Sequence, residues 1–276
     1  MITDDLTNYL YLSDQLQTRI QFFASLTETL RKEKIEYQIL PHTKDIWCRD
    51  YMPVQIEGNR FVQFRYEPSY LQSKKWIHTQ TDAEFVCSEI GIACEKSNLK
   101  LDGGNIIKGD SWIIITDKVF SENKQCTQNQ VISELERLLQ VKIIIIPREP
   151  YEMTGHADGI LHYYNKDTVL VNHYEGNEFN YFQTKLNSSL KSAGISSIEV
   201  PYHPIKGKSL SAEGLYINFL QMDKFILVPV FDLTEDGHTL QLFEQLYPTS
   251  VIRSIKSQEI ARDGGVLNCI SWNIMR

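Results

Sequence analysis

Five short segments of the chain each combine a reactive or charged side chain with residues that favour tight turns. They are WCRDYMP (47–53), LDGGN (101–105), GHAD (155–158), SAEGLYINF (211–219) and DGGVLNC (263–269). Together they supply a thiol, an imidazole and several carboxylates. Such a set suits covalent catalysis, in which a cysteine attacks the substrate and a histidine moves the protons.

Taken singly, each of these side chains also has an ordinary structural interpretation. Asp50 lies in a turn-forming segment, and Asp102 precedes two glycines, a pattern typical of a hairpin or bulge. His156 and Asp158 are two residues apart, so in an extended segment both project from one face, where they could serve acid–base chemistry or ligate a metal. Cys269 lies in a predicted apolar C-terminal strand, where most cysteines are inert core residues.

Composition narrows the class of protein. The 276 residues carry a formal net charge of −7, so the chain lacks the basic surface of a nucleic-acid-binding protein, and an acidic cleft could attract a cationic substrate. The five cysteines are odd in number and form no CxxC pair, which argues against a disulfide framework and a structural zinc site. The N-terminus does not resemble a signal peptide, and the densest apolar run, residues 141–146, is too short to span a membrane. We therefore expect a cytoplasmic protein with no nucleic-acid or membrane partner.

The elements that must position the five segments alternate between strand-like and helical patterns, which predicts an α/β fold. The predicted strands are residues 61–66, 112–116, 142–147, 168–173, 225–230 and 267–274. The predicted helices lie near residues 79–91, 127–140, 179–193 and 238–246, with an N-terminal helix over about 4–33. No linker-like stretch interrupts the chain, so residues 1–276 are expected to form one domain.

The ordered set WxRDxxP, (D/E)GGN, GHxD, YxNF and GGxxxC resembles the agmatine deiminase and Porphyromonas-type peptidylarginine deiminase family, within the guanidine-group-modifying superfamily. The resemblance extends from Asp45 to Ile274. It implies a single deiminase-like catalytic domain, built as a pseudo-fivefold α/β propeller of ββαβ units around a central active site. It also implies a C–N hydrolase that needs no cofactor and no metal.

The resemblance implies a role for six residues of this chain. Cys269 matches the nucleophile, His156 the general acid and base, and Asp102 the acid that orients the histidine. Asp50 and Asp158 match carboxylates that hold a guanidinium group, whose planar, permanent charge suits paired carboxylate contacts. Trp47 matches an aromatic residue that lines the substrate channel. Asp102 departs from the family pattern, which usually has the longer glutamate.

The expected reaction is attack of the thiol on the guanidinium carbon of an agmatine- or arginine-like substrate, with release of ammonia and a ureido product. Two alternatives remain open at this point. One is an amidinotransferase or dihydrolase on the same fold, because fold alone does not fix the reaction. The other is a homologue that binds guanidinium groups without turnover. The motifs leave open which guanidine is the substrate (agmatine, arginine, peptidyl-arginine or another), and also the oligomeric state.

Overall fold

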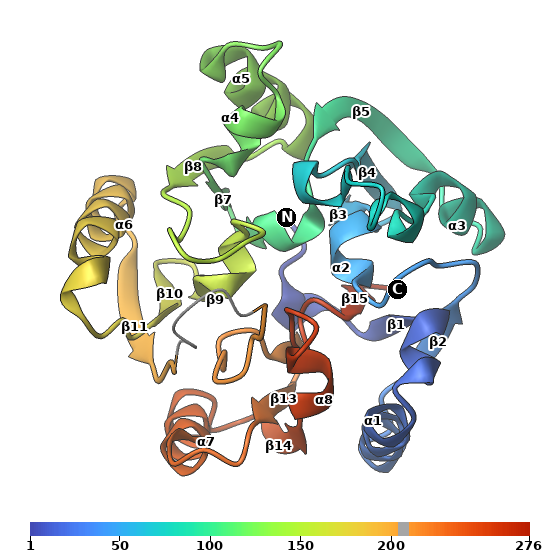
Figure 1. The fold of residues 1–276 in the computed structure, drawn as a ribbon, viewed down its shortest axis with the longest axis vertical. Coiled ribbons are helices and arrows are strands. Elements are labelled where there is room, and N and C mark those ends of the chain that lie inside the picture. Colours follow the sequence, from blue (N-terminus) through green and yellow to red (C-terminus); the bar gives the residue numbers. More distant parts are fainter. Residues whose placement is uncertain (204–209) are drawn as a thin grey trace.

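Five small sheets form a ring around a common centre in the computed structural model, which describes residues 1–203 and 210–276 (Figure 1). In each sheet, two of the three strands pair in antiparallel orientation, and the third pairs in parallel with the middle strand. A parallel pair needs a crossover connection, and here a helix on the outside of the ring provides it. The predicted pseudo-fivefold α/β propeller of ββαβ units is confirmed.

Four of the sheets are continuous in sequence. The first contains β3 (Val54–Glu57), β4 (Arg60–Arg65) and β5 (Cys94–Lys100), with helix α3 (Ala83–Glu89). The second contains β6 (Ile107–Lys108), β7 (Trp112–Thr116) and β8 (Lys142–Ile146), with α4 (Lys118–Glu122) and α5 (Gln128–Leu139). The third contains β9 (Leu161–Asn165), β10 (Thr168–Asn172) and β11 (Ser196–Val200), with α6 (Asn180–Ala193). The fourth contains β12 (Leu220–Met222), β13 (Phe225–Val230) and β14 (Val251–Lys256), with α7 (Glu235–Leu246).

The fifth sheet joins the two ends of the chain and closes the ring. Its middle strand β1 (Tyr9–Ser13) pairs with the C-terminal strand β15 (Ser271–Ile274) on one side and with β2 (Tyr37–Leu40) on the other. Helix α1 (Ile20–Lys32) connects β1 to β2. The strand predicted over residues 267–274 therefore begins only at Ser271, because the four residues before it form a turn.

The prediction of one N-terminal helix over residues 4–33 is wrong, because β1 occupies part of that segment. Leu10 and Leu12 pack in one hydrophobic cluster, whereas Tyr11 between them packs in another. This alternation has the period of a strand that is buried on both faces. The apolar residues of β1 and α1 follow one another at a spacing that also fits a helix. The sequence pattern therefore predicted a single helix over both elements.

The core lies between neighbouring sheets, as β7 illustrates. Trp112 and Ile114 pack toward the third sheet in one cluster, and Ile113 and Ile115 pack with the first sheet in another. Every residue of β7 is buried. A strand covered on both sides has no polar face, which explains why this segment reads as a continuous apolar run.

The outer helices are amphipathic and have clear boundary signals, as α5 illustrates. Thr127 and Gln130 form a reciprocal capping box at its start, and Gln140 takes a left-handed conformation at its end. Its buried face includes Val131 and Leu135. In the described parts of the chain, no helix is both long enough and apolar enough to cross a bilayer.

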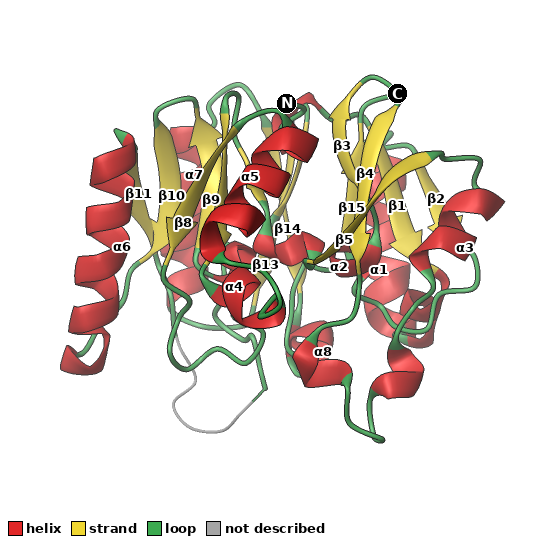
Figure 2. Ribbon diagram, turned by 90° about the horizontal axis from the view of Figure 1, so that it is seen from above, coloured by secondary structure: helices red, strands yellow, loops and turns green. Residues whose placement is uncertain are grey.

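Short helical segments connect the larger elements. They are the α-helices α2 (Cys48–Tyr51) and α8 (Gln258–Ala261) and the 3-10 helices η1 (Asp4–Leu6), η2 (Asp14–Thr18), η3 (Ser69–Leu71), η4 (Ile77–Thr79), η5 (Gly103–Asn105), η6 (Ala157–Gly159) and η7 (Asn177–Phe179). Figure 2 shows both chain termini at one end of the propeller and α2, α4 and α8 toward the other. The candidate site side chains come from α2, from the turns that accompany η5 and η6, and, for Cys269, from the turn before β15.

Candidate active site

The five motifs occupy equivalent places in the five sheets. Each lies just before the first strand of its sheet, with Asp50 before β3, Asp102 before β6, His156 before β9, Asn218 before β12 and Cys269 before β15. The third strand of each sheet lies toward the outer helices, and the first lies toward the centre (Figure 1). The motifs, which are far apart in sequence, therefore converge at one end of the central axis.

Asp50 projects from α2 and meets the turn that carries the two glycines. The backbone N–H of Gly104 donates a hydrogen bond to Asp50 Oδ1 at 3.1 Å. A Cβ at Gly104 would lie only 2.5 Å from this oxygen and 2.8 Å from His156 Nδ1. A Cβ at Gly103 would lie 2.0 Å from the carbonyl oxygen of Arg49. Gly104 is needed because its backbone passes directly against the candidate site side chains, and Gly103 because it passes against the backbone of α2.

His156 is held between two carboxylates. Its Nε2 lies 2.8 Å from Asp102 Oδ2, and its Nδ1 lies 3.5 Å from Asp50 Oδ1. An ionised carboxylate can only accept, so Nε2–H donates to Asp102, and Nδ1 faces Asp50. The shorter Asp102 thus reaches the imidazole, where the family usually has glutamate.

Cys269 and Asp158 are adjacent, and two asparagines fix the carboxylate. The thiol donates to Asp158 Oδ2 at 3.4 Å. The same oxygen accepts from Asn268 Nδ2 at 2.8 Å and from Asn218 Nδ2 at 3.1 Å. The backbone N–H of Cys269 in turn donates to Asn218 Oδ1 at 3.2 Å. Asn218 therefore positions the thiol and its neighbouring carboxylate relative to each other.

A cavity of about 500 Å³ opens onto these groups. Its wall includes Trp47, Asp50, His156, Asp158 and Cys269. The structure thus brings together five of the six site residues predicted from the sequence, and the sixth, Asp102, lies behind the imidazole. Their catalytic and binding roles stay predictions.

Burial and negative neighbours hold the site in a proton-rich state. Burial, together with the charges of Asp158 and Asp50, raises the pKa of the Cys269 thiol well above its usual range. Burial likewise raises the pKa of Asp158, and it raises the pKa of Asp50 to about 7. Each shift disfavours the charged form of an acid that is removed from water. A cation placed between the two carboxylates would reverse these shifts.

For His156, in contrast to these acids, the environment favours the charged form. Burial lowers its pKa and the nearby Lys118 ammonium lowers it further, but Asp50 and Asp102 outweigh both, and the pKa rises to about 9. Burial disfavours the charged form of Asp102, yet Lys118 and His156 bring the pKa of that carboxyl below its usual value. At neutral pH the imidazole is therefore protonated and can donate from Nδ1.

Sequence reasoning missed some residues of the site. Asn218 was part of the quoted YINF motif but was given no role. Lys118 and Tyr70 belong to none of the five motifs, and nothing in the letters around them signals a buried polar contact. Cys48, inside the first motif, was also given no role, and its thiol is buried and donates to the carbonyl of Ile270 at 2.9 Å. Within residues 1–203 and 210–276, no group of three or more His, Cys, Asp or Glu side chains could hold a metal ion.

The chain is similar to known proteins in sequence and in structure. The sequence profile described as Porphyromonas-type peptidyl-arginine deiminase matches residues 9–274. A relative from Photobacterium profundum, named "Putative agmatine deiminase", is 22% identical over 274 residues, which cover 84% of this chain and 75% of that protein. Similarly named relatives from Listeria monocytogenes and Mycoplasma capricolum are matched over only 58% and 63% of their length.

Two solved structures of C. jejuni agmatine deiminase share the fold. The first superposes with a TM-score of 0.81 at 18% identity, covering 100% of this chain and 95% of that one. The second, a variant with substrate bound, gives 0.82 at 17% identity, covering 100% and 96%. At such identities the likeness establishes the fold of the chain.

Proposed function

Because the chain belongs to the Porphyromonas-type peptidyl-arginine deiminase family, whose members are hydrolases of amidine C–N bonds, we propose that it hydrolyses the guanidinium group of a small agmatine-like substrate through a covalent intermediate on Cys269. The observation that carries the proposal is the convergence of one thiol, one imidazole and two carboxylates on a single cavity. Asp50 and Asp158 both line this cavity, and in the proposal they hold the guanidinium.

Substrate binding activates the nucleophile in this proposal. The pKa of Cys269 is raised by burial and then by Asp158 and Asp50. A guanidinium cation between the carboxylates offsets their charge, so the thiol releases its proton to solvent as the substrate binds. The thiolate sulfur then attacks the central guanidinium carbon, and a C–S bond forms in a tetrahedral adduct.

His156 then moves protons in both halves of the reaction. Its Nδ1–H protonates one nitrogen of the adduct, the C–N bond breaks, ammonia leaves, and a cationic amidino thioether remains on Cys269. Nδ1 next accepts a proton from water as the water oxygen attacks the same carbon. The C–S bond breaks and the thiolate is regenerated. The hydroxyl proton of the product is then released, and the ammonia that left earlier takes up one proton to become ammonium. The products are ammonium and a ureido compound.

The rest of the cavity wall favours a substrate whose tail is cationic. Its acidic residues beyond the reacting centre, apart from Asp263, which pairs with Arg19, are Asp45, Glu149, Glu152, Glu178 and Glu213. Burial raises the pKa of Asp45 to about 8 and that of Glu149 to about 7, so these two carry only part of the negative charge. Among the described residues that line the cavity, no Lys or Arg is present to pair with a substrate carboxylate. An agmatine-like guanidine with a terminal amine suits this wall better than free arginine, whose α-carboxylate would be repelled.

The test is a colour assay for ureido product together with an ammonia assay across agmatine, free arginine, peptides with arginine, methylated arginines and small guanidines. We expect equimolar ammonia and ureido product, with agmatine-like compounds preferred and with no product from Cys269→Ser. Turnover that requires an added amine acceptor would replace the deiminase with an amidinotransferase. Binding of guanidines without turnover would identify a non-catalytic homologue.

A further inference from the structure

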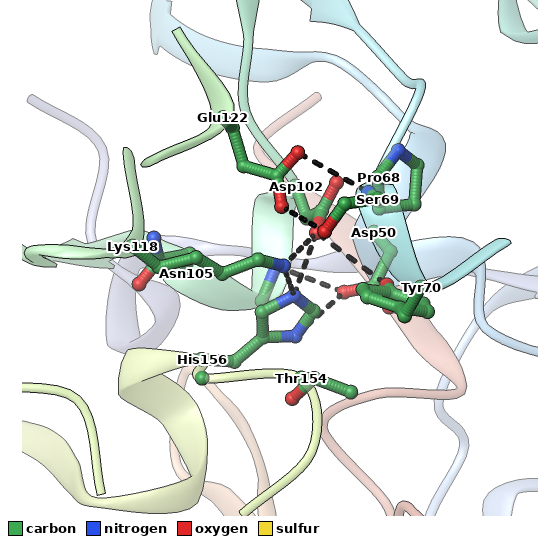
Figure 3. A network of polar contacts seen from close by, with 12 residues as sticks. Asp50, Pro68, Ser69, Tyr70, Asp102, Asn105, Lys118, Glu122, Thr154 and His156 are labelled. Atoms are coloured by element: carbon green, nitrogen blue, oxygen red, sulfur yellow. Dashed lines mark hydrogen bonds and ion pairs between the residues drawn. The ribbon is translucent and has the colours of Figure 1, made fainter. Parts of the chain in front are cut away.

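A buried lysine lies behind the imidazole, on the side away from the cavity. Lys118 is the first residue of α4 and is 5% exposed. Its Nζ donates to Asp102 Oδ2 at 2.8 Å and lies 3.3 Å from His156 Nε2. The ammonium also lies 4.6 Å from the centre of the Tyr70 ring. Figure 3 shows the lysine side chain ending beside the imidazole of His156 and the carboxylate of Asp102.

We propose that Lys118 is a positioning residue that acts with Asp102 as one charge-compensated unit, fixing the orientation and the protonation of His156. The inference rests on the proposed role of His156 as acid and base. It adds a second group to the orienting acid and gives a reason for the shorter aspartate at position 102.

Asp102 is held by three contacts to one of its oxygens. One oxygen, Oδ2, receives Lys118 Nζ at 2.8 Å, His156 Nε2 at 2.8 Å and the Tyr70 hydroxyl at 3.4 Å. Asp102 is one methylene shorter than glutamate, so its carboxylate cannot follow the imidazole if the ring shifts. Lys118 and Tyr70 hold the acceptor from the other side, which keeps Oδ2 at the point where Nε2–H can reach it.

Helix α4 makes this arrangement rigid through a second residue. Glu122, at its other end, accepts from the Ser69 hydroxyl at 2.6 Å and from the Ser69 backbone N–H at 3.1 Å. Ser69 begins η3, which carries Tyr70. One short helix therefore supplies the lysine and also anchors the tyrosine that covers it (Figure 3).

The charge of Lys118 opposes the effect of the carboxylates on His156. The ionisable groups around His156 are Asp50 from α2, Asp102 beside η5, Asp158 from η6, Tyr70 from η3, Lys118 from α4 and Glu152, which accepts from the His156 backbone N–H at 3.3 Å. Four of these are carboxylates, which favour the imidazolium. The imidazole must also lose its proton to accept one from water. A cation 3.3 Å from Nε2 opposes the carboxylates and keeps that neutral form within reach.

The chain offers a matched control for the loss of a buried lysine. Lys108 Nζ also lies 2.8 Å from an aspartate, Asp4, and its side chain is 9% exposed. This pair belongs to η1 and β6 and makes no contact with the His156 imidazole. Lys118→Met and Lys108→Met therefore each remove one buried ammonium. Only the ammonium of Lys118 lies next to the imidazole.

The experiment is an NMR titration of the His156 ring in the full chain, with its signals assigned by their loss in His156→Asn. We expect Lys118→Met to raise the titration midpoint of His156 by ~1 pH unit or more, because the repelling cation is gone. The limb of the kcat–pH profile that reports His156 should move in the same direction, and kcat should fall more than KM changes. Lys108→Met should leave the midpoint in place.

An unmoved or lowered His156 midpoint in folded Lys118→Met would overturn the inference and leave Lys118 with a packing role only. Circular dichroism checks that the variant folds. If Lys118→Met does not fold, Lys118→Gln removes the same charge while keeping a polar tip, and the same shift is required of it. The titration does not depend on turnover, so a failure of this inference is distinguishable from a failure of the proposed activity.

Discussion

Asp158→Asn should change two properties of the site in opposite directions, raising the reactivity of the Cys269 thiol and weakening the binding of guanidinium ligands. Asp158 Oδ2 accepts a hydrogen bond from the Cys269 thiol at 3.4 Å, and its charge raises the thiol pKa. The proposed function also makes it one of two groups that hold the guanidinium. Asparagine keeps the shape and removes the charge. We therefore expect a more reactive thiol together with weaker binding of guanidinium ligands.

The magnitudes follow from the position of the charge. Removing a like charge at this distance lowers a thiol pKa by ~1–3 units. The thiolate fraction then rises, but its intrinsic nucleophilicity falls, so alkylation by neutral iodoacetamide should accelerate by about 3- to 60-fold. Binding should change the other way, because losing one partner of a buried charge pair costs about 3–5 kcal/mol. That corresponds to roughly 10²- to 10³-fold weaker affinity or more.

The assay measures iodoacetamide labelling of the Cys269 peptide by mass spectrometry at one pH, in the parent and in Asp158→Asn. Guanidinium affinity is measured by calorimetry with Cys269→Ser in both backgrounds, which prevents turnover. Asp263→Asn is the control, since Asp263 lines the same cavity but pairs with Arg19 at the surface at 2.6 Å. Labelling that stays constant or slows in a folded Asp158→Asn protein would refute this account of the thiol.

Three further predictions concern other parts of the site. Cys269→Ser and His156→Ala should each remove nearly all turnover, and the double variant should be no worse than either, because the two act as one unit; additive losses in steady-state kinetics would contradict this. Gly104→Ala should destabilise the fold by about 1–3 kcal/mol in thermal unfolding and abolish turnover, because its Cβ would lie 2.5 Å from Asp50 Oδ1, whereas Gly237→Ala, with nothing within 4 Å, should be harmless. Guanidinium affinity should rise as pH increases through about 7, where Asp50 ionises, since only the ionised carboxylate attracts the cation; a calorimetric affinity that is flat between pH 6 and 8 (approximately one unit on either side) would count against Asp50 as a binding group.

The motifs could be found from sequence because the fold repeats. Asp50, Asp102, His156, Asn218 and Cys269 all precede the first strand of a sheet. A position that recurs five times around an axis places five side chains at the same end of that axis. Turn residues beside reactive side chains picked out the segments, and the resemblance of the ordered set to a known family predicted that they share one site, because spatial adjacency cannot be seen in a linear sequence.

Residues at other positions of the repeat could not be found in this way. Lys118 follows β7, the middle strand of its sheet, and reaches the imidazole only because α4 begins there. In sequence it is a lysine between the predicted strand at residues 112–116 and the predicted helix near residues 127–140, for which an exposed position is the ordinary expectation. The misassigned helix over residues 4–33 has a related cause. The pairing of β1 with β15 depends on the far end of the chain, and no local pattern can report it.

The charges of the site link substrate choice to the chemistry. The groups that carry them are the carboxylates Asp50, Asp102 and Asp158 and the cations Lys118 and His156. With a neutral thiol this leaves one negative charge in excess when all three carboxylates are ionised, and forming the thiolate adds a second, which is unfavourable in a buried site. A guanidinium cation removes the excess at the moment the nucleophile is needed. The ureido group of the product is neutral and offers no such compensation between the carboxylates, so we expect the product to bind less well than the substrate and to leave. In the proposed function, this charge excess would therefore select a cation, tie thiolate formation to its arrival and favour release of the product.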